Sequence, residues 1–411
     1  MPLNISPDEA RDALTEQAIR LTAECLPLTA ALGRVNAKDV FASHNVPPFR
    51  RSPFDGYALL ASDTENASER NPAVLEIIEE IPAGKEPKRE VTSGKASKIL
   101  TGAPVPVGAD AVVKFEEVIF TDTQVKIPFK LQPERNIIGV GEDVTKGKLL
   151  VSAGGRLSAP MLGVLAGQGI CKVEVYRKPA VTVFSTGAEL AEPGQELRRA
   201  QIYNSNTYSI GAYIAEMGCD VIFGRTVEDD PVEIAAVLER AFASSDLTVT
   251  TGGVSVGDYD FVPEAVNRLG FSVIFRKVRF KPGGSMMAAV KDGKVLLALS
   301  GNPSAAVTGL LYVAAPYIRM LCGRKDVLPK TLEAALDKPL EKKSPKTRFL
   351  CGKLVFAGGQ VRFRESNRRG NGIISSFVGC DSLAVISAGS PELPEGTFVT
   401  VYRVLGNDGN D

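Results

Sequence analysis

The chain has 411 residues, of which 44% are hydrophobic and 23% are charged, the composition of an ordinary globular protein. A chain this long exceeds one compact core, so we expect two to four domains. Its 48 basic and 48 acidic residues balance, which argues against a general binder of nucleic acid or of anionic membranes. The sequence shows no signal pattern and no apolar run long enough for a membrane helix, and it therefore predicts a cytoplasmic protein.

The sequence limits histidine and cysteine chemistry. His44 is the single histidine, so a histidine-based metal site or catalytic triad is excluded. Far apart and without a C-x-x-C pair, the cysteines predict neither a zinc site nor a disulfide framework; they are Cys25, Cys171, Cys219, Cys322, Cys351 and Cys380. Carboxylates, lysines, hydroxyls and backbone groups must therefore carry the chemistry.

The first 178 residues change character twice. Residues 1–24 predict an amphipathic helix that begins with Ser6 as cap and an acidic first turn. Short β-type segments separated by Gly and Pro then predict a β-rich domain over 46–145, with strands at 73–81, 98–100, 111–115 and 124–128. Residues 146–178 return to the first pattern, so we expect 1–45 and 146–178 to form one discontinuous domain.

Residues 179–325 alternate between apolar strands and helical stretches. Strands are expected at 180–184, 219–223, 248–250 and 272–275, with a further pair around 292–293 and helices near 210–217, 231–243, 262–269 and 303–320. Repeated β-loop-α units predict a doubly wound α/β domain. After Gly323 the helical signal fades, and strands at 349–355, 360–364 and 398–404 predict a small C-terminal β domain over 326–411.

The sharpest local signal is the glycine turn after the strand at 248–250. Gly252 and Gly253 let the backbone approach a ligand and turn N–H groups toward an anion, while Ser255 and Asp260 add a hydroxyl and a carboxylate. Ligands of open α/β sheets bind beyond the carboxyl ends of the strands. We therefore expect this loop to form the floor of an active site.

Other polar residues also follow strands. Asp230 precedes Pro231 and is expected to cap a helix, which leaves Asp229 to face a ligand. The motif of Ser300, Gly301, Asn302 and Pro303 opens a helix whose N-terminus suits a phosphate, although an ordinary turn explains it nearly as well; Thr186 and Glu189 complete the rim.

A cationic run follows the strand at 272–275. Period-two spacing places Lys277, Arg279 and Lys281 on one face of a strand. A charged edge that blocks aggregation is one explanation. The alternative is an anion site with Mg²⁺ alongside, because Asp229 and Asp260 lie on the neighbouring loops and magnesium bridges carboxylates and phosphates.

Taken together and in order, eight motifs resemble the molybdopterin molybdenumtransferase family (MoeA), to which the E domain of gephyrin is related. They are FDGYA at 54–58, LTGAPVP at 100–106, GED at 141–143, FSTGAEL at 184–190, DDP at 229–231, TGGVSVG at 251–257, KPG at 281–283 and GNP at 301–303. The resemblance covers nearly the whole chain.

The resemblance implies an L-shaped homodimer of four-domain subunits. Residues 1–45 and 146–178 would form an elongated linker and dimerisation domain, 179–325 a domain similar to the adenylyltransferase MogA, and 326–411 a small β-barrel-like domain. The family converts adenylylated molybdopterin and molybdate, with Mg²⁺, into molybdenum cofactor and AMP. A MogA-type adenylyltransferase and molybdoenzyme apoproteins are implied partners. The active site of the molybdenumtransferase family lies between the third domain of one subunit and the β-rich second domain of its partner.

Roles for individual residues follow from the same resemblance. Metal ligands would be Glu189, Asp229 and Asp260. Lys277 and Lys281 would attract molybdate, and together with Asp55, Asp143 and Asp260 they form the catalytic set. The substrate's phosphates would contact Thr101, Thr186, Gly252, Gly253, Ser255, Ser300, Gly301, Asn302 and Pro303.

Several positions depart from the family pattern. Arg50 and Arg51 replace an Asp-Asn pair, and the others are Ala188 for Asp, Gly284 for Lys, Ser300 for Pro, and a residue near Cys351 for Arg. These changes keep a tungstate-preferring protein and a non-catalytic binding protein open as alternatives. The similarity of the third domain to MogA adds a molybdopterin adenylyltransferase as a third alternative. A dinucleotide dehydrogenase is disfavoured because no strand leads into a G-x-G-x-x-G turn.

Overall fold

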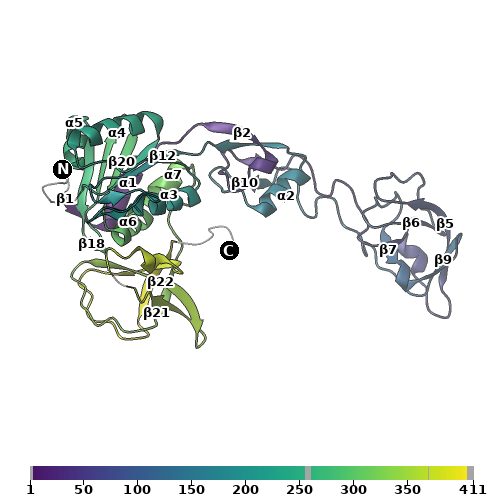
Figure 1. Cartoon of the computed structure of the whole chain (residues 1–411). Helices are drawn as coiled ribbons and strands as arrows, with labels where there is room; N and C mark the ends of the chain where they lie inside the picture. Colours follow the sequence, from purple (N-terminus) through teal and green to yellow (C-terminus); the bar gives the residue numbers. More distant parts are fainter. Residues whose placement is uncertain (1–2, 255–260, 369, 405–411) are drawn as a thin grey trace. The chain divides into compact units, whose positions relative to one another are not determined.

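A computed structural model describes residues 3–254, 261–368 and 370–404, and the chain divides into two compact units (Figure 1). The first unit comprises Met1–Lys38, Ala153–Ser158 and Lys172–Asp411. The second unit comprises Asp39–Ser152 and Ala159–Cys171. The four-domain division expected from the sequence stays a prediction.

A seven-stranded sheet forms the centre of the first unit. Its strands occur in the order β1 (Leu3–Ile5), β17 (Ser272–Val278), β19 (Met287–Lys291), β20 (Lys294–Leu299), β16 (Leu247–Thr251), β12 (Ala180–Ser185) and β15 (Asp220–Phe223). The last four are mutually parallel, and β19 is antiparallel to both of its neighbours. Every residue of β16 is buried, because helices cover both faces of the sheet.

Helices pack on both faces of this sheet, as Figure 1 shows. One face carries α1 (Pro7–Thr15), α3 (Asn206–Glu216) and a continuous helical segment made of α6 (Pro303–Gly309), a π-helical turn (Leu310–Ala314) and α7 (Ala315–Leu321). The other face carries α4 (Pro231–Ser244) and α5 (Val262–Arg268). The predicted doubly wound α/β domain is thereby confirmed.

Two sequence expectations about helices were wrong. The helix expected over 1–24 spans nine residues, because Leu3–Ile5 pairs with β17 and β2 (Ala23–Pro27) pairs with β11 (Lys172–Tyr176). The segment Pro303–Leu321 is long and apolar enough to cross a membrane, whereas the sequence led us to expect no such run. Its most apolar window is 94% buried inside the protein, as in a core helix.

The C-terminal strands close into a five-stranded barrel. Strand β22 (Thr347–Ala357) pairs with both β23 (Gln360–Glu365) and β24 (Ser382–Ile386), and the ring continues through β21 (Thr331–Leu336) and β25 (Phe398–Arg403). Sequence reasoning predicted a small β domain here but missed β21 and β24. Strand β18 (Phe280–Lys281), which follows β17, pairs with β22 and joins the barrel to the α/β part.

The second unit contains a six-stranded sheet, as expected for a β-rich region. Its order is β7 (Ala111–Lys114), β4 (Gly56–Leu59), β6 (Lys95–Ile99), β5 (Ala73–Ile81), β9 (Gln124–Ile127) and β8 (Ile119–Phe120). Tyr57 and Leu59 of β4 lie in its core. The unit also contains α2 (Ala159–Gly167) and the pair of β3 (Val40–Phe41) and β10 (Leu149–Val151).

Candidate active site

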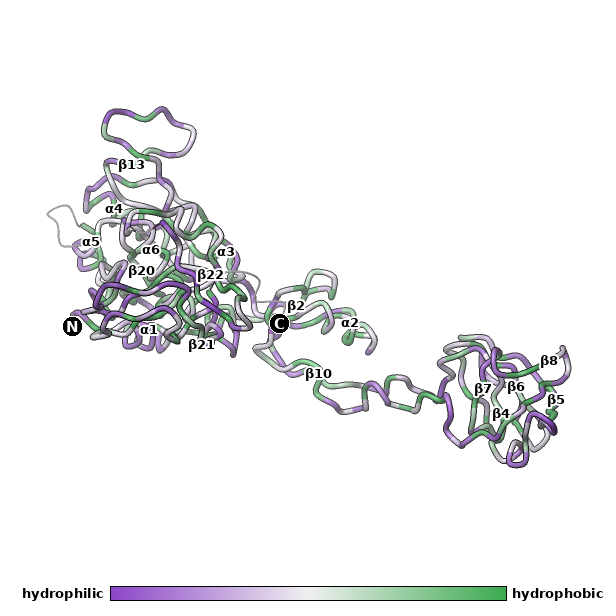
Figure 2. Tube along the Cα trace, turned by 90° about the horizontal axis from the view of Figure 1, so that it is seen from below, coloured by the Kyte–Doolittle hydropathy of each residue, from purple (hydrophilic) through white to green (hydrophobic). Residues whose placement is uncertain are grey.

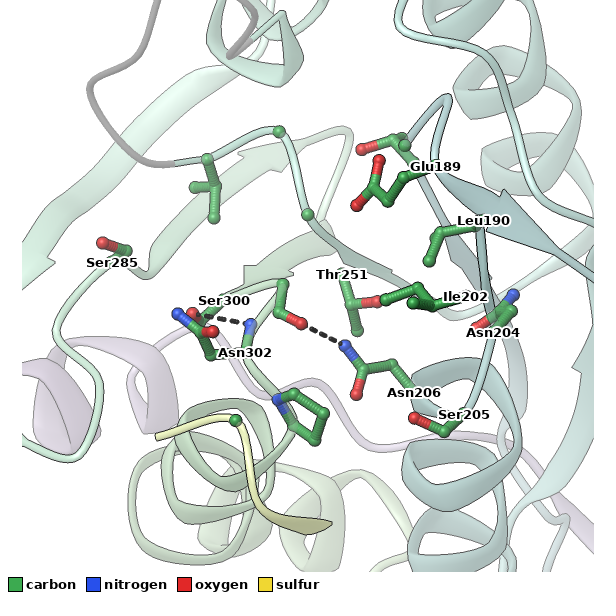
Figure 3. A pocket seen from close by; sticks show the side chains of 18 of the residues that line it. Glu189, Leu190, Ile202, Asn204, Ser205, Asn206, Thr251, Ser285, Ser300 and Asn302 are labelled. Atoms are coloured by element: carbon green, nitrogen blue, oxygen red, sulfur yellow. Dashed lines mark hydrogen bonds between the residues drawn. The ribbon is translucent and has the colours of Figure 1, made fainter. Parts of the chain in front are cut away.

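A cleft of about 640 Å³ lies at the carboxyl ends of β12, β16 and β20 in the first unit (Figure 3). The strand order changes direction here, because β15 and β16 flank β12 while α3 and α4 cover opposite faces. Predicted residues lining the cleft are Thr186, Glu189, Asp229, Gly252, Gly253, Ser300, Gly301, Asn302 and Pro303. Ser255 and Asp260 lie outside the described residues.

The glycine turn must consist of glycine for a steric reason. Gly252 and Gly253 have φ of +90° and +60°, a region that residues with a side chain rarely adopt. A Cβ on Gly252 would lie 2.4 Å from the carbonyl oxygen of Thr186, and one on Gly253 would lie 2.9 Å from the Thr186 hydroxyl. The turn therefore packs directly against the end of β12.

The donors available to an anion differ from those expected. The N–H of Gly252 donates to the carbonyl of Leu299 (3.1 Å), and the N–H of Asn302 donates to the Ser300 hydroxyl (3.2 Å). Both N–H groups were expected to face an anion, and both are used within the protein instead. Among the described residues, the N–H groups of Gly253 and Gly301 have no acceptor. The Thr186 hydroxyl likewise has no partner there, although the residue is only 4% exposed.

Two predicted metal ligands line the same cleft. Asp229 Oδ2 accepts the N–H of Ala188 at 3.1 Å, and the Glu189 carboxylate folds back over Gly187. The described residues contain no group of three His, Cys, Asp or Glu side chains arranged to hold a metal. Mg²⁺ commonly takes one or two carboxylates and completes its shell with phosphate oxygens and water. Glu189 and Asp229 fit that pattern.

Asp230 has the structural role predicted for it. Its carboxylate accepts the N–H groups of Val232 (2.7 Å) and Glu233 (2.9 Å) and caps α4, with Pro231 at the first helical position. Neighbouring acids therefore have different functions, and Asp229 is the one that lines the cleft.

Sequence reasoning missed the wall formed by the segment before α3. Asn206 donates from Nδ2 to the carbonyl of Gly301 at 2.8 Å and ties α3 to the loop that opens α6, as the dashed line in Figure 3 shows. Asn204, Ser205 and the apolar Ile202 and Leu190 also line the cleft. Asn and Ser before a helix are typical capping residues, so the sequence alone did not indicate that these residues also line the cleft.

A buried network fixes Asn204. Its Oδ1 accepts the Ser185 hydroxyl (3.1 Å), and its Nδ2 donates to Thr226 (3.1 Å) and Glu192 (3.4 Å). Burial raises the pKa of Glu192, but hydrogen bonds from Thr226, Asn204 and Tyr208 outweigh it and leave the pKa lowered. Glu192 is therefore a charged structural anchor at the base of the segment between β13 (Leu190–Ala191) and β14 (Ile202–Tyr203), which projects from the first unit and is mostly hydrophilic in Figure 2.

The prediction that three cations share one strand face was wrong. Strand β17 ends at Val278 and β18 joins the barrel sheet, while Lys277 has a φ of +65° that breaks the alternation. Arg279 instead reaches the N-terminus of the chain, where it donates to the carbonyl of Asn4 at 2.6 Å and lies 3.9 Å from Glu9. Lys277 is not among the residues that line the cleft.

Lys281 lines a second pocket of about 210 Å³ on the barrel side of α6, here called the barrel-side pocket. Its charged side chains are Lys281, Arg348, Arg368 and Glu365, so cations outnumber carboxylates. The two pockets are adjacent, because Pro303 and Gly372 line the cleft while the following Ser304 and the preceding Asn371 line the barrel-side pocket. The Ser304 N–H donates to the carbonyl of Asn371 (3.0 Å), which fixes this partition.

The remaining predicted residues belong to the second unit. Asp55 Oδ1 accepts both the N–H (2.7 Å) and the hydroxyl (2.8 Å) of Thr101, and these bonds lower the pKa of Asp55. Asp143 is exposed, and its N–H donates to the carbonyl of Val46. Two of the three predicted residues are thus brought together. At the departing position 50, Arg50 pairs with Glu134 at 2.6 Å.

Three family descriptions match the chain in succession. They are the MoeA N-terminal region (domain I and II) over residues 5–169, a probable molybdopterin binding domain over 182–320, and the MoeA C-terminal region (domain IV) over 333–404. A protein of Staphylococcus epidermidis named molybdopterin molybdenumtransferase is 33% identical, with 98% of this chain and 96% of the relative covered. A Staphylococcus aureus protein of the same name is 32% identical, with 96% and 94% covered.

Solved structures give the same result. The molybdopterin biosynthesis MoeA protein of Pyrococcus horikoshii superposes with a TM-score of 0.84 at 32% identity, covering 98% of this chain and 100% of that one. A molybdenum cofactor biosynthesis protein of Pyrococcus furiosus has a TM-score of 0.60 at 18% identity and shares the fold.

Proposed function

Because this chain belongs to the MoeA family of molybdopterin molybdenumtransferases, we propose that it inserts molybdate into adenylylated molybdopterin and releases AMP. The cleft is the main support for this proposal, because the Gly252–Gly253 turn, two carboxylates and the start of a long helix all line it. Anionic phosphates need donors and a positive helix end, and magnesium needs carboxylate oxygens. The cleft provides both.

The phosphates of the substrate would be held by groups that have no acceptor among the described residues. Gly253 N–H, Gly301 N–H and the Thr186 hydroxyl are such donors. The helical segment from Pro303 to Leu321 begins beside them, so its dipole favours an anion at this end. Asn206 fixes the position of Gly301 through its hydrogen bond, and in this way sets the spacing between the two loops.

Glu189 and Asp229 are the residues that would hold Mg²⁺ in this proposal. When bound, the ion polarises phosphoryl oxygens and offsets charge on the departing AMP. The N–H of Ala188 would orient Asp229 for this task, because its bond to Oδ2 leaves Oδ1 for the ion. The family's Asp at position 188 would add a carboxylate, and the alanine here leaves the backbone donor intact.

Molybdate would enter through the barrel-side pocket. It is a tetrahedral dianion, and Lys281, Arg348 and Arg368 supply cationic donors around a space next to the cleft. Ser304 and Ser376 add hydroxyls to the same lining. In this proposal Lys281 attracts molybdate, as the sequence predicted. Lys277 lines neither pocket, so the same role for Lys277 stays a prediction.

Completion of the site by a second copy of the chain is the further part of the proposal. The resemblance implies a homodimer in which Asp55, Thr101 and Asp143 of the partner subunit face the cleft. Their exposure on the second unit supports this, since exposed side chains are available to another subunit. A cytoplasmic location and Mg²⁺ dependence belong to the same proposal, as do the implied MogA-type and apoenzyme partners.

The test is to incubate the protein with adenylylated molybdopterin and Mg²⁺, with and without molybdate, and to measure AMP. We expect AMP release that depends on molybdate. Release with tungstate in preference to molybdate would indicate the tungstate-preferring alternative, and tight binding without release would indicate a binding protein. Consumption of ATP with unmodified molybdopterin would indicate an adenylyltransferase and contradict the proposal.

A further inference from the structure

Two cysteines that are 103 residues apart in sequence meet at the end of the first unit away from the cleft. The Sγ atoms of Cys219 and Cys322 lie 3.7 Å apart, and both residues are buried with 5% exposure. Cys219 follows α3, and Cys322 ends α7. We propose that these thiols are an oxidation site at which a hydroperoxide forms a reversible disulfide.

An oxidant can reach the pair through a cavity. Cys322 lines a pocket of about 190 Å³ whose other lining includes Arg34, Arg156, Arg324 and Glu216. Hydrogen peroxide is no larger than two water molecules, so a pocket of this size admits it. Cys219 does not line the pocket, so Cys322 is the thiol of the pair that an entering molecule meets first.

The surroundings favour the thiolate at Cys322. The contact with Cys219, in which either thiol can donate, lowers the pKa of Cys322 most, and nearby Arg324, Arg156 and Arg319 lower it further, although burial opposes ionisation. As a thiol, Cys322 also donates to the carbonyl of Met217 at 3.6 Å. The same hydrogen bond and burial raise the pKa of Cys219. The thiol with the lower pKa therefore lies in contact with the thiol with the higher pKa, the arrangement of attacking and resolving cysteines.

The reaction balances without any further reagent. The Cys322 thiolate attacks one peroxide oxygen, the O–O bond breaks, and the departing hydroxide takes up a proton to leave as water, giving a sulfenic acid on Cys322. The Cys219 sulfur then attacks the Cys322 sulfur, the S–S bond forms as the S–O bond breaks, and the departing hydroxide leaves as a second water with the proton of the Cys219 thiol. Two thiols are oxidised and one peroxide is reduced, and a dithiol reductant reverses the change.

The cross-link would join two helical segments that already contact each other at their N-terminal and C-terminal ends. α3 and the α6–α7 segment both begin at the cleft, where Asn206 bonds to Gly301, and both end at the thiol pair. A disulfide there would close a loop of about 100 residues, for which stabilisation is among the largest expected for single disulfides. Oxidation should therefore raise the melting temperature of the full chain, on the order of 5 °C.

Peptide mapping of the full-length protein tests the proposal directly. The protein is treated with a small excess of hydrogen peroxide, blocked with an alkylating reagent and digested with trypsin. We expect a cross-link between the peptides of residues 200–225 and 320–324, which carry Cys219 and Cys322. Dithiothreitol should remove it and reverse the rise in melting temperature.

Internal controls and two variants sharpen the result. Burial raises the pKa of Cys351, whereas the surroundings of Cys322 lower its pKa, so the second pair of Cys351 and Cys380 should react more slowly. Cys219→Ser should accumulate a sulfenic acid at Cys322 that dimedone traps, whereas Cys322→Ser should leave Cys219 unmodified. Failure of the cross-link to form at peroxide levels that oxidise the exposed Cys25 and Cys171 would overturn the proposal, as would dimedone labelling of Cys219 first.

Discussion

The two units present their predicted functional residues in opposite ways. In the first unit, glycines, hydroxyls and carboxylates follow neighbouring parallel strands, and the strand ends gather them into one walled cleft. In the second unit, Asp55, Thr101 and Asp143 lie exposed on turns around an antiparallel and mixed sheet. In the proposed function, the first arrangement would enclose the substrate, and the second would offer two carboxylates and a hydroxyl to another subunit.

The difference shows what each kind of position tolerates. A residue in the cleft is held by packing on several sides, as Gly252 is by Thr186 and Leu299, so a small change there disturbs several loops. Within the described part of the chain, the exposed Asp55 carboxylate accepts hydrogen bonds from Thr101 alone, so its loss should affect function without affecting the fold.

The largest effect is expected for Asp229→Asn. The substitution keeps an oxygen for the Ala188 N–H but removes the charge that faces the cleft, so AMP release should fall about 100-fold. The matched control is Asp230→Asn, because Asn caps a helix as well as Asp does. Equal losses in the two variants, measured as initial rates of AMP formation, would contradict the assignment of Asp229.

The next effect concerns the glycine turn and stability. Gly252→Ala places a Cβ 2.4 Å from a backbone oxygen at a φ of +90°, and we expect it to lower the free energy of unfolding by about 2–4 kcal/mol. At Gly301 the nearest atom would be at an ordinary 3.4 Å, so Gly301→Ala should cost less than about 1 kcal/mol. Urea unfolding compares the two, and a larger loss at Gly301 would refute the packing argument.

A smaller effect is expected for the barrel-side pocket. Lys281→Ala should raise the molybdate concentration needed for half-maximal AMP release about tenfold, since one cation leaves the proposed oxyanion pocket. Arg279→Ala is the control, because Arg279 bonds to the carbonyl of Asn4 instead. If both variants respond to molybdate as the wild type does, molybdate does not bind at Lys281.

The smallest effect is the pH dependence of Thr226→Val. The Thr226 hydroxyl donates to Glu192 at 2.6 Å and helps to lower the pKa of Glu192. A carboxylate with a lowered folded-state pKa stabilises the fold above its unfolded-state pKa, and that stability is lost as the pH falls through the folded-state value. We expect a cost of about 1–2 kcal/mol at pH 7 that shrinks below about pH 4.

Thr248→Val serves as the control for that measurement. The Thr248 hydroxyl is buried in β16 without a partner among the described residues, so its removal should be neutral or stabilising at every pH. A cost for Thr226→Val that stays constant from about pH 7 to about pH 3.5 would show that the charge of Glu192 plays no part.

Local patterns predicted much of this architecture. Strand ends followed by Gly or Asp identified the loops of the cleft, because in a parallel sheet such ends meet at one edge. The same patterns did not reveal that the N–H groups of Gly252 and Asn302 are used within the protein. Their acceptors are the carbonyl of Leu299 on a neighbouring strand and the Ser300 hydroxyl, whose position depends on its side-chain rotamer. Long-range pairing explains why the three cations do not share one strand face. The chain passes from the central sheet in β17 to the barrel sheet in β18 within three residues.

The measurement that most directly tests the central claim is complementation between the two units. Asp55→Ala and Asp229→Asn chains carrying different tags are co-expressed, and the mixed dimer is purified through both tags. If each site combines the first unit of one subunit with the second unit of its partner, the mixed dimer has one intact site and should show about half of wild-type AMP release, while both parent dimers are inactive. A mixed dimer as inactive as its parents would contradict the shared site.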